Sequence, residues 1–368
     1  MPYAHITGWG MAVPQKVLTN FDLEKMVETS DAWIRERTGI RERRIAGPDE
    51  HPSVLGARAA LQALEVARLH PKDVELIICA TSSPEHLFPA TACLIQDAIG
   101  ASKAGAFDLL AACSGFIYAV QMAAQAIRSG AIQNALVIGA ETLSRITNWK
   151  ERNTCILFGD GAGAFVLQAS ERPGGVLAAV MHSDGSGGDL LIIPAGGSRM
   201  PASLETVSNG YHYIHMDGRE VFRFATRVLT QSTWEVLEKA NLKLEDIRWI
   251  IPHQANYRII EAAARSLKLP IERFIINLDR YGNTSTASVP IATCEAAEKG
   301  LLKAGDKIVF NGFGAGLTWG AMVVEWTGPL PSATRPIRPQ RYRPVARLRS
   351  WWHRFLRLLE GLIWGRRA

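Results

Sequence analysis

Short runs of apolar residues alternate along this chain with longer segments in which apolar residues recur every three or four positions. The runs predict strands at 76–80, 107–110, 135–139, 164–167, 249–253 and 307–311. The periodic segments predict amphipathic helices at 54–69, 115–129, 221–240 and 287–299. Strands that alternate with helices in this way are typical of an α/β protein.

Two pairs of predicted strands repeat at nearly the same spacing. Ile77 and Ile250 occupy matching places in two such units and lie 173 residues apart, and Leu136 and Ile308 lie 172 residues apart. A shared offset indicates an internal duplication. We therefore expect two similar halves, with an active site at the junction where their helix N-termini converge.

The basic character of the chain is confined to its end. The net charge is +6, but residues 331–368 contain ten Arg and one Glu, a charge of +9, which leaves 6 − 9 = −3 for the rest. A mildly acidic body gives no support for nucleic-acid binding.

The cysteines and the apolar runs bear on the compartment. Five cysteines, Cys79, Cys93, Cys113, Cys155 and Cys294, are scattered without a CxxC pair. This pattern favours a reducing, cytoplasmic compartment and argues against a zinc site. The N-terminus lacks the charged and apolar segments of a signal peptide, and no run of about 18 uncharged apolar residues predicts a membrane span.

Cys113 falls between the strand 107–110 and the helix 115–129, in the small-residue sequence AACSG. A helix N-terminus has unpaired N–H groups and a partial positive charge, both of which stabilise a thiolate. We expect this position to lower the pKa of the thiol from about 8.5 toward neutrality. A nucleophile and a buried structural cysteine are both compatible with this stretch alone.

Two polar residues of the second half are further candidates. His253 ends the strand 249–253, and Asn283 lies in the sequence YGNTS before the helix 287–299. A lone histidine is more often structural, but one at the end of a strand is a better candidate for chemistry.

At these motifs the chain resembles a known family. AACSG at Cys113, PHQANYRI at His253 and YGNTS at Asn283 are similar to the three signatures of the ketoacyl-ACP synthase III family. Further similar segments are TSDAW and RTGIR within 29–41, RNT and FGDGAG within 152–163, and FGAGLTWG at 313–320. The resemblance covers about residues 3–326, in the order of the family.

This resemblance implies the thiolase fold, in which two duplicated α/β halves form a five-layer αβαβα sandwich, and a homodimer. Residues 1–172 then form the half with the nucleophile, and residues 173–328 the half with the histidine and asparagine. Residues 329–344 are expected to be a Pro/Arg-rich linker and residues 345–368 a basic amphipathic tail helix. Neither has a counterpart in the family plan.

The implied reaction initiates fatty-acid synthesis. Cys113 takes the acyl group from an acyl-CoA primer, malonyl-ACP loses CO₂, and the resulting enolate attacks the acyl-Cys to give 3-oxoacyl-ACP. His253 and Asn283 stabilise the enolate, and the N–H groups of Cys113 and Ala315 form the oxyanion hole. Acyl-CoA and the acyl carrier protein (ACP) are therefore the expected partners, and neither a cofactor nor a metal is implied.

The same resemblance implies sets of binding residues. Those for CoA and its pantetheine arm are Thr29, Trp33, Arg37, Arg152, Gly218, Phe222 and Asn256. Those for ACP are Arg223, Gln254, Arg258 and Arg265, and Phe88 extends from the partner subunit toward the acyl pocket. From the residues alone, a Trp in a basic segment is more typical of a packed Trp beside a solvated face; the resemblance replaces that interpretation for Trp33.

Other functions stay open. A condensing enzyme of secondary metabolism would use an unusual primer or a CoA-bound extender. A type III polyketide synthase shares Cys, His and Asn but fits Trp33 and Arg152 less well, and a degradative thiolase needs a second cysteine that the segment 313–320 lacks. A non-catalytic scaffold held by its tail is the alternative of another class. The motifs do not define the length of the primer.

The tail has a pattern of its own. One helical stripe contains Leu348, Trp351, Trp352, Phe355, Leu358, Leu359, Leu362 and Ile363. The opposite stripe contains Arg347, Ser350, Arg354, Arg357 and Gly361. A basic amphipathic helix with tryptophans is typical of a membrane surface. We expect residues 345–364 to contact the inner face of the membrane; docking on the body or on the dimer mate is the alternative.

Overall fold

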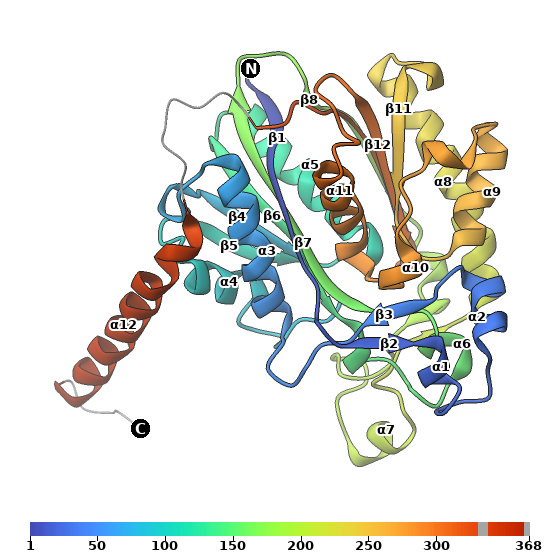
Figure 1. The fold of residues 1–368 in the computed structure, drawn as a ribbon. Coiled ribbons are helices and arrows are strands. Elements are labelled where there is room, and N and C mark those ends of the chain that lie inside the picture. The colour runs from blue at the N-terminus through green and yellow to red at the C-terminus, as the bar shows by residue number, and fades with distance from the viewer. Residues whose placement is uncertain (330–337, 364–368) are drawn as a thin grey trace.

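Two mixed β-sheets form the centre of the molecule (Figure 1). The computed structural model describes residues 1–329 and 338–363, with side chains as far as residue 359. The first sheet has the order β1 (Tyr3–Ala12), β7 (Asp160–Ser170), β6 (Asn134–Thr142), β4 (Leu76–Ala80) and β5 (Gly105–Leu109). The second has the order β8 (Gly175–Ser183), β13 (Thr318–Glu325), β12 (Lys307–Gly314) and β11 (Ile247–Pro252).

The two sheets repeat one plan. Strands β4 and β6 are parallel and pair Ile77 with Leu136, and β11 and β12 are parallel and pair Ile250 with Val309. The paired residues are 59 apart in both sheets, and each pair of strands is followed by an antiparallel neighbour, β7 or β13. The duplication predicted from the spacing is therefore a property of the fold.

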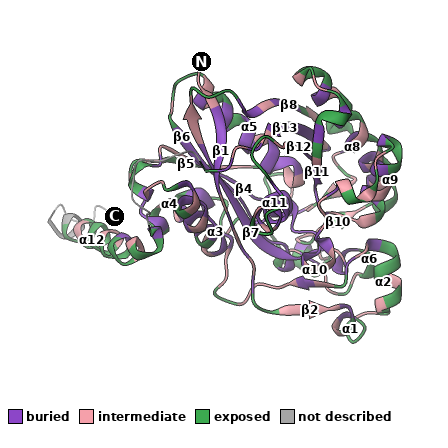
Figure 2. Cartoon of the chain, turned by 45° about the horizontal axis from the view of Figure 1, so that its top comes forward, coloured by how far each residue is buried: buried purple, intermediate pink, exposed green. Residues whose placement is uncertain are grey.

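Helices form the other three layers. Between the sheets lie α5 (Gly115–Arg128) and α11 (Ser288–Glu298); α3 (Pro52–Ala67) and α4 (Thr91–Ile99) cover the first sheet, and α8 (Gly218–Ala240) and α9 (Tyr257–Leu267) cover the second. Buried residues concentrate on the sheets and the central helices (Figure 2). The rings of Phe116, Phe165 and Phe310 connect α5 with both sheets, at centroid distances of 5.0 and 6.1 Å. This is the predicted five-layer αβαβα sandwich.

Short elements surround the mouth of the site, below the sheets in Figure 1. They are β2 (Val17–Thr19), α1 (Asn20–Leu23), α2 (Asp31–Thr38), β3 (Glu42–Arg44), α6 (Arg152–Cys155), β9 (Leu191–Ile192), α7 (Leu204–Ser208), β10 (His215–Met216) and α10 (Leu278–Tyr281). Helix α2 begins where the Ser30 hydroxyl accepts the Trp33 N–H and ends at Gly39, whose φ of +79° suits glycine. The remaining 3₁₀ turns include η2 (Ala112–Ser114) and η7 (Ser285–Ala287).

The tail helix α12 (Arg343–Ile363) extends away from the body (Figure 1). It begins before residue 345, and the 3₁₀ turn η8 (Pro339–Tyr342) precedes it, so the prediction of a linker as far as residue 344 is wrong at this end. The reason is packing, because Pro339 and Ala346 are buried against the body. Linker residues 330–337, residues 364–368 and the side chains of Gly361, Leu362 and Ile363 lie outside the described part.

Gly139 of β6 makes a contact between the halves that admits no side chain, which gives a stability prediction. A Cβ at Gly139 would lie 2.3 Å from the carbonyl oxygen of Thr286 in η7. We expect Gly139→Ala to lower the free energy of unfolding by about 1–3 kcal/mol, measured by urea denaturation, because the halves must separate. Gly185→Ala is the control, since no atom lies within 4 Å of its Cβ position; a similar loss in both variants would contradict the assignment.

Candidate active site

The cysteine lies on a turn that the duplication repeats. Turn η2 connects β5 to α5, and η7 stands 173 residues later, directly before α11. The first residue of each turn is left-handed, with φ of +44° at Ala112 and +47° at Ser285. Residues with a Cβ rarely adopt this conformation, and such positions concentrate at functional sites.

Burial controls the ionisation of Cys113. Loss of water raises the pKa of the thiol to about 12, an effect that the Ser285 hydroxyl opposes and the charge of Glu141 reinforces. The prediction of a pKa near neutrality is therefore wrong for the free protein: desolvation outweighs the favourable position before α5. The resting group is a thiol, and its activation requires a route for the proton.

His253 lies directly after β11 and is buried. Its backbone N–H donates to the Asn311 carbonyl oxygen at 2.8 Å, its Nδ1 lies 2.7 Å from the Ser288 hydroxyl, and the Phe313 ring packs edge-on at 5.3 Å. Burial lowers the pKa of the imidazole to about 3. The ring is therefore neutral at physiological pH, and the contact with Ser288 leaves Nε2 free to face the cavity.

Asn283 is held by both its backbone and its side chain. Its N–H donates to Leu157 and its carbonyl oxygen accepts from Gly159, so the turn is tied to the first half. The side-chain oxygen accepts the Ser285 N–H at 2.8 Å. With its oxygen engaged, the Asn283 amide presents its NH₂ group as a donor.

The three residues meet at one narrow cavity of about 90 Å³. The structure thus brings together Cys113 of the first half and His253 and Asn283 of the second. The predicted tunnel residues Gly218, Phe222 and Asn256 line the same cavity. Phe158, Ala255, Ile259, Phe313 and Gly314, which also line it, lie within the quoted motifs but were not singled out there. The motifs did not include the lining residues Leu157, Leu191, Met216 and Val221. An apolar channel of this kind suits a flexible chain more than a broad polar ligand.

The end of β12 packs on the cysteine turn. A Cβ on Gly314 would lie 2.6 Å from the Cys113 nitrogen, so the backbone at the end of β12 approaches closely at this point. The Ser114 hydroxyl lies 2.7 Å from both the Ala111 carbonyl oxygen and Thr318 Oγ1. Ala315 is not among the residues with positive φ. Its Cβ therefore causes no backbone strain of this kind.

Two cationic side chains lie close to the Trp33 ring. The guanidinium carbons of Arg37 and Arg152 are 5.4 and 4.9 Å from the centre of its ring. Arg152 also donates to the Glu28 carbonyl oxygen. Nearby, the hydroxyl oxygen of Thr29 is buried and has no hydrogen-bond partner within the described residues. Arg152 therefore covers the Trp33 ring in the free protein, and the hydroxyl of Thr29 is left without a partner among the described residues.

The residues assigned to the ACP surface differ in their exposure. Arg223, Arg258 and Arg265 are exposed; Arg223 and Arg265 form ion pairs of 2.9 Å with Glu220 and Glu261 of their own helices. Such exposed pairs are weak, so these arginines can exchange partners.

Gln254 is a different case, and its assignment to this surface is wrong. It is buried, its NH₂ group donates to the carbonyl oxygens of Pro252 and Ile275, and its oxygen accepts the Asn277 N–H. Its side chain is occupied in holding the loop after His253.

Phe88 does not line the cavity of its own chain. It is 84% exposed, as is Leu87 beside it. Strand β5, at the edge of the first sheet, exposes Phe107 and leads to the exposed Leu110. A free strand edge and large exposed apolar side chains are features of an interface.

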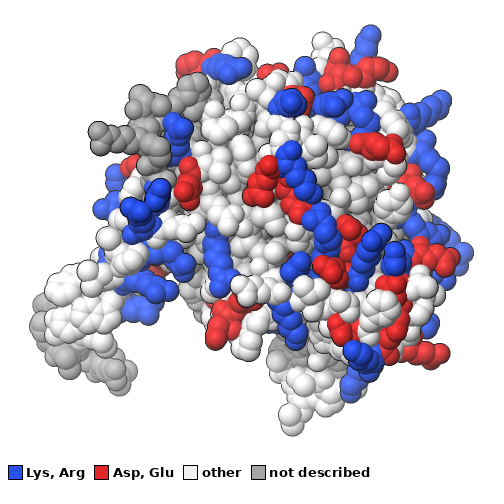
Figure 3. Space-filling model, viewed as in Figure 1, with Lys and Arg blue, Asp and Glu red and all other residues white. Residues whose placement is uncertain are grey.

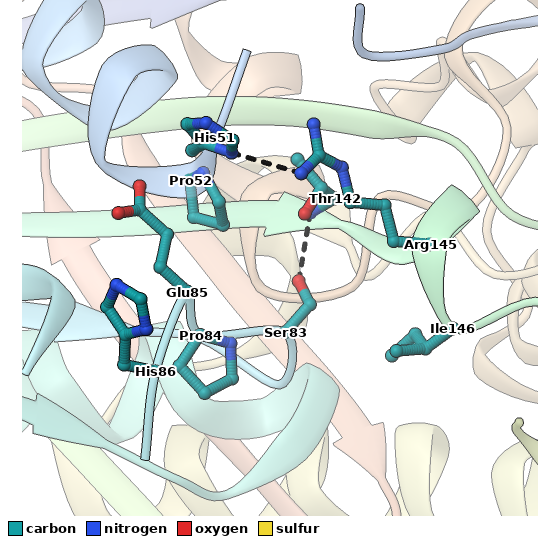
Figure 4. Close-up of a pocket in the computed structure, with 9 residues that line it drawn as sticks. All are labelled: His51, Pro52, Ser83, Pro84, Glu85, His86, Thr142, Arg145 and Ile146. Carbon is teal, nitrogen blue, oxygen red and sulfur yellow. Dashed lines mark hydrogen bonds between the residues drawn. The ribbon is translucent and has the colours of Figure 1, made fainter. Parts of the chain in front are cut away.

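A buried carboxylate connects β6 with a second cavity. Glu141 of β6 is fully buried and accepts a 2.6 Å hydrogen bond from the Ser83 hydroxyl. Ser83 also lines a cavity of about 270 Å³ with His51, Glu85, His86 and Arg145 (Figure 4). Sequence reasoning missed Glu141, since a single Glu in an apolar strand is a weak signal. It also missed Ser288, one of many hydroxyl residues in 284–288.

No group of three or more His, Cys, Asp or Glu among the described residues is arranged to hold a metal ion. No helix in the described part combines the length and apolarity needed to cross a bilayer.

Comparisons with known proteins agree with this architecture. Models of the 3-oxoacyl-[acyl-carrier-protein] synthase III family match residues 107–185 and, for its C-terminal part, 237–326. A beta-ketoacyl-[acyl-carrier-protein] synthase III from Caldanaerobacter subterraneus is 56% identical over 324 residues, which cover 88% of this chain and 98% of that protein.

Two solved structures show the same fold. The 3-oxoacyl-[acyl-carrier-protein] synthase III of Aquifex aeolicus superposes with a TM-score of 0.81 at 48% identity, covering 88% of this chain and all of that one. The priming β-ketosynthase of the R1128 polyketide pathway has a TM-score of 0.82 at 34% identity, covering 89% and 97%. The fold and the site define a thiolase-fold condensing enzyme, an acyltransferase. The chain belongs to the ketoacyl-ACP synthase III family.

Proposed function

We propose that this protein joins an acyl-CoA primer to malonyl-ACP with loss of CO₂, forms 3-oxoacyl-ACP, and so initiates fatty-acid synthesis. The observation that carries the proposal is the convergence of Cys113, His253 and Asn283 on one apolar channel. The reaction needs a sulfur nucleophile and two neutral hydrogen-bond donors at a single point. It uses no cofactor besides its substrates.

The first half-reaction is acyl transfer to Cys113. The sulfur attacks the thioester carbon, and the oxyanion that forms is stabilised by the N–H groups of Cys113 and Ala315. The close packing of Gly314 on the Cys113 nitrogen supports this pair of donors. Departure of CoA leaves an acyl-Cys at the end of the channel.

The second half-reaction needs stabilisation of an enolate. A neutral imidazole and an amide NH₂ donate hydrogen bonds without taking up a proton permanently. The low pKa of His253, caused by burial, keeps it in this form. When Ser288 donates to Nδ1, Nε2 carries the hydrogen and donates to the enolate oxygen together with Asn283.

The family resemblance supports the assignment of the substrate residues that we propose here. Trp33 and Arg152 hold the adenine of CoA between them, Thr29 bonds the base edge and Arg37 the phosphate; Gly218, Phe222 and Asn256 surround the pantetheine. Arg223, Arg258 and Arg265, which are exposed, face the acidic carrier protein. A priming ketosynthase of polyketide synthesis is the second candidate, favoured by the relative at 34% identity. The 56% identity to a ketoacyl-ACP synthase III favours the first.

A homodimer through β5 would complete the acyl pocket. The free edge of β5 and the exposure of Leu87, Phe88 and Leu110 support this proposal. Phe88 then enters the partner subunit, because it does not line the cavity of its own chain.

The tail helix α12 supports the proposal of a peripheral position on a membrane. The supporting observation is which face of the helix contacts the body. Its small and polar face docks on the body: Ala346 is buried near Gly100, Ser350 donates to Asp97 of α4 at 2.7 Å, and Arg354 lies 3.9 Å from the same carboxylate. A tail helix that served only to pack on its own chain would bury its apolar face against the body instead. The docked arrangement leaves that face without a partner in the described chain.

Charge makes an anionic surface the best match for this face. Leu348, Trp351, Trp352, Phe355, Leu358 and Leu359 are 36–65% exposed. Basic residues surround the point where α12 leaves the body, and an uncharged surface follows (Figure 3). Full burial of such apolar side chains is worth about 1.5–3 kcal/mol each, and each basic residue adds about 1 kcal/mol on an anionic surface. We infer a peripheral location at the cytoplasmic face of the membrane.

The condensation proposal is tested by the two half-reactions. Cys113→Ser should abolish the acyl-enzyme, since a serine hydroxyl there has no base strong enough to activate it. Mass spectrometry after incubation with acyl-CoA should show an adduct on Cys113 and on none of the other four cysteines. His253→Ala and Asn283→Ala should keep this adduct and lower condensation with malonyl-ACP by roughly 10²–10³. An adduct in the Ser variant, or equal loss of both half-reactions in both Ala variants, would refute the assigned roles.

The CoA proposal is tested by the unpartnered hydroxyl of Thr29. Thr29→Val should weaken CoA binding by roughly three- to tenfold in a calorimetric titration, since one hydrogen bond is worth about 1 kcal/mol. The stability of the free protein should not fall, because the hydroxyl is unpaired there. Thr91→Val is a matched control, since Thr91 also has a buried, unpartnered hydroxyl, on α4. Equal effects on CoA binding in both variants would contradict the site.

The membrane proposal is tested by sedimentation with vesicles. The full chain should pellet with phosphatidylglycerol vesicles at low salt and remain free with phosphatidylcholine vesicles. Replacing Trp351 and Trp352 by Ala should release it, whereas Trp234→Ala on α8, where the Trp is 48% exposed, should not. If the Trp351/Trp352 variant binds as well as the natural chain, the apolar face has a protein partner instead.

A further inference from the structure

We propose that Arg43 and Asn20 are positioning residues for CoA: together they set the spacing of the helices α2 and α6, which carry Trp33 and Arg152. The inference deepens the proposed function and rests on the CoA site proposed there. Neither Arg43 nor Asn20 is accessible to CoA itself, because both side chains are fully buried. Their effect on CoA must therefore pass through the two helices.

Arg43 of β3 is a buried cation that binds neutral groups. Its Nη1 donates to the Leu18 carbonyl oxygen at 3.2 Å and to Asn20 Oδ1 at 2.9 Å, and its Nη2 donates to the Ile156 carbonyl oxygen at 2.6 Å. Burial lowers the pKa of Arg43 to about 10, so the group stays charged at physiological pH. Burying a charge without a counter-charge beside it is unfavourable. The filling of space alone does not explain an arginine here.

Asn20 holds both ends of α2. Its Nδ2 donates to Asp31 Oδ1 at 2.9 Å and to the Ile40 carbonyl oxygen at 2.8 Å. Asp31 is the first residue of α2, and Ile40 directly follows Gly39, at which the helix ends. The bond from Arg43 occupies the amide oxygen of Asn20, so the NH₂ group is directed at the two acceptors. Arg43 thereby fixes the orientation of the amide that holds α2.

The other end of this network is α6. Ile156, whose carbonyl oxygen accepts from Arg43, is the residue at which α6 ends. A continuous path of hydrogen bonds therefore leads from α6 through Arg43 and Asn20 to both ends of α2; the two helices lie next to each other in Figure 1. Arg152 is the first residue of α6, and its guanidinium carbon lies 4.9 Å from the centre of the Trp33 ring.

Apolar packing holds the same two helices together but leaves their spacing less defined. Ile34 of α2 and Cys155 of α6 belong to one buried cluster, together with Leu23 and Ile156. Apolar burial is non-directional, so such a cluster tolerates small shifts. Hydrogen bonds depend steeply on distance and angle. The polar path is therefore the part of this contact that can define where the Trp33 ring stands relative to Arg152.

Arg43 also packs on the turn before Asn283. A Cβ on Gly159 would lie 3.0 Å from the Arg43 Cβ, and a Cβ on Gly282 would lie 3.2 Å from it. A change at Arg43 can therefore disturb Asn283 as well as the CoA site. For this reason the test measures acylation of Cys113, a step in which Asn283 has no assigned role.

The first measurement is a calorimetric titration with adenosine 3′,5′-bisphosphate, the nucleotide end of CoA. Arg43→Lys keeps the charge but loses the planar group that binds Asn20 and Ile156 at once. Asn20→Asp keeps the size of the side chain and the acceptor for Arg43, but directs an oxygen at Asp31 and Ile40 in place of the NH₂ group. Each variant should weaken binding of the nucleotide roughly five- to thirtyfold, the effect of losing one or two hydrogen bonds.

The second measurement separates positioning from a general loss of structure. Cys113 is acylated with the acyl-CoA that reacts fastest with the natural chain, and with the pantetheine thioester of the same acyl group, and the product is followed by mass spectrometry. Only the CoA substrate carries the nucleotide. Both variants should raise the KM for acyl-CoA by the same factor as in the titration and keep kcat. The KM and kcat for the pantetheine thioester should not change.

Arg273→Lys is the matched control. Arg273 also donates to backbone carbonyl oxygens, those of Ile247 and Arg248, but at the beginning of β11, the end opposite to His253. This variant should bind the nucleotide like the natural chain and keep the KM for both thioesters.

Two results would overturn the inference: natural affinity for the nucleotide in both variants, or an equal rise of the KM for both thioesters. Arg43 and Asn20 would then have a structural role only. If Arg43→Lys does not fold, Asn20→Asp decides, because it retains the acceptor for Arg43. Failure of the proposed CoA site appears differently, in the natural chain itself, as equal KM values for acyl-CoA and the pantetheine thioester and no binding of the nucleotide.

Discussion

The close contact between β6 and the turn η7 is the constraint on which the site depends. Each half carries a left-handed turn that leads into a central helix, and the two helices share one layer between the sheets. Turn η7 packs closely on β6 because Gly139 has no side chain and lets the Thr286 carbonyl approach the strand, and η7 also contacts η2. This contact places Cys113 of one half within the same cavity as His253 and Asn283 of the other. Neither half contains a complete site, so the reaction requires the two halves to pack against each other.

The dry environment created by this packing determines the roles of the ionisable groups. Burial disfavours charge on every group, and it therefore moves the pKa values of acids and bases in opposite directions. The Cys113 thiol becomes harder to ionise and the Glu141 carboxylate more basic, while the His253 imidazole becomes less basic. A histidine in this state is suited to donate a hydrogen bond to a developing enolate. It is unsuited to take the proton of the thiol, which leaves that task to another group.

The tail shows how one helix can have two faces with different partners. Helix α12 uses Ala346, Ser350 and Arg354 to fix its beginning on α4, which sets the direction in which it leaves the body. Its large apolar residues face away from that contact. The anchoring contacts come from small and polar residues, so they orient the helix without using the large apolar side chains of the face that we assign to the membrane.

The sequence by itself determined the fold class, the duplication and the three central residues. The period of apolar residues and the spacing between predicted strands are both visible in the sequence. Short motifs at strand ends can be located even when the predicted boundaries of an element are off by a few residues. It did not determine the ionisation of Cys113, because burial arises from both halves together. It assigned Gln254 to a surface, whereas the folded loop turns that side chain inward. The contact between Glu141 and Thr286 could not be predicted, since the two residues lie 145 apart in the chain and meet only after the two halves have packed. Tertiary structure alone decided which groups lose water and which meet, and those two outcomes set the chemistry of the site.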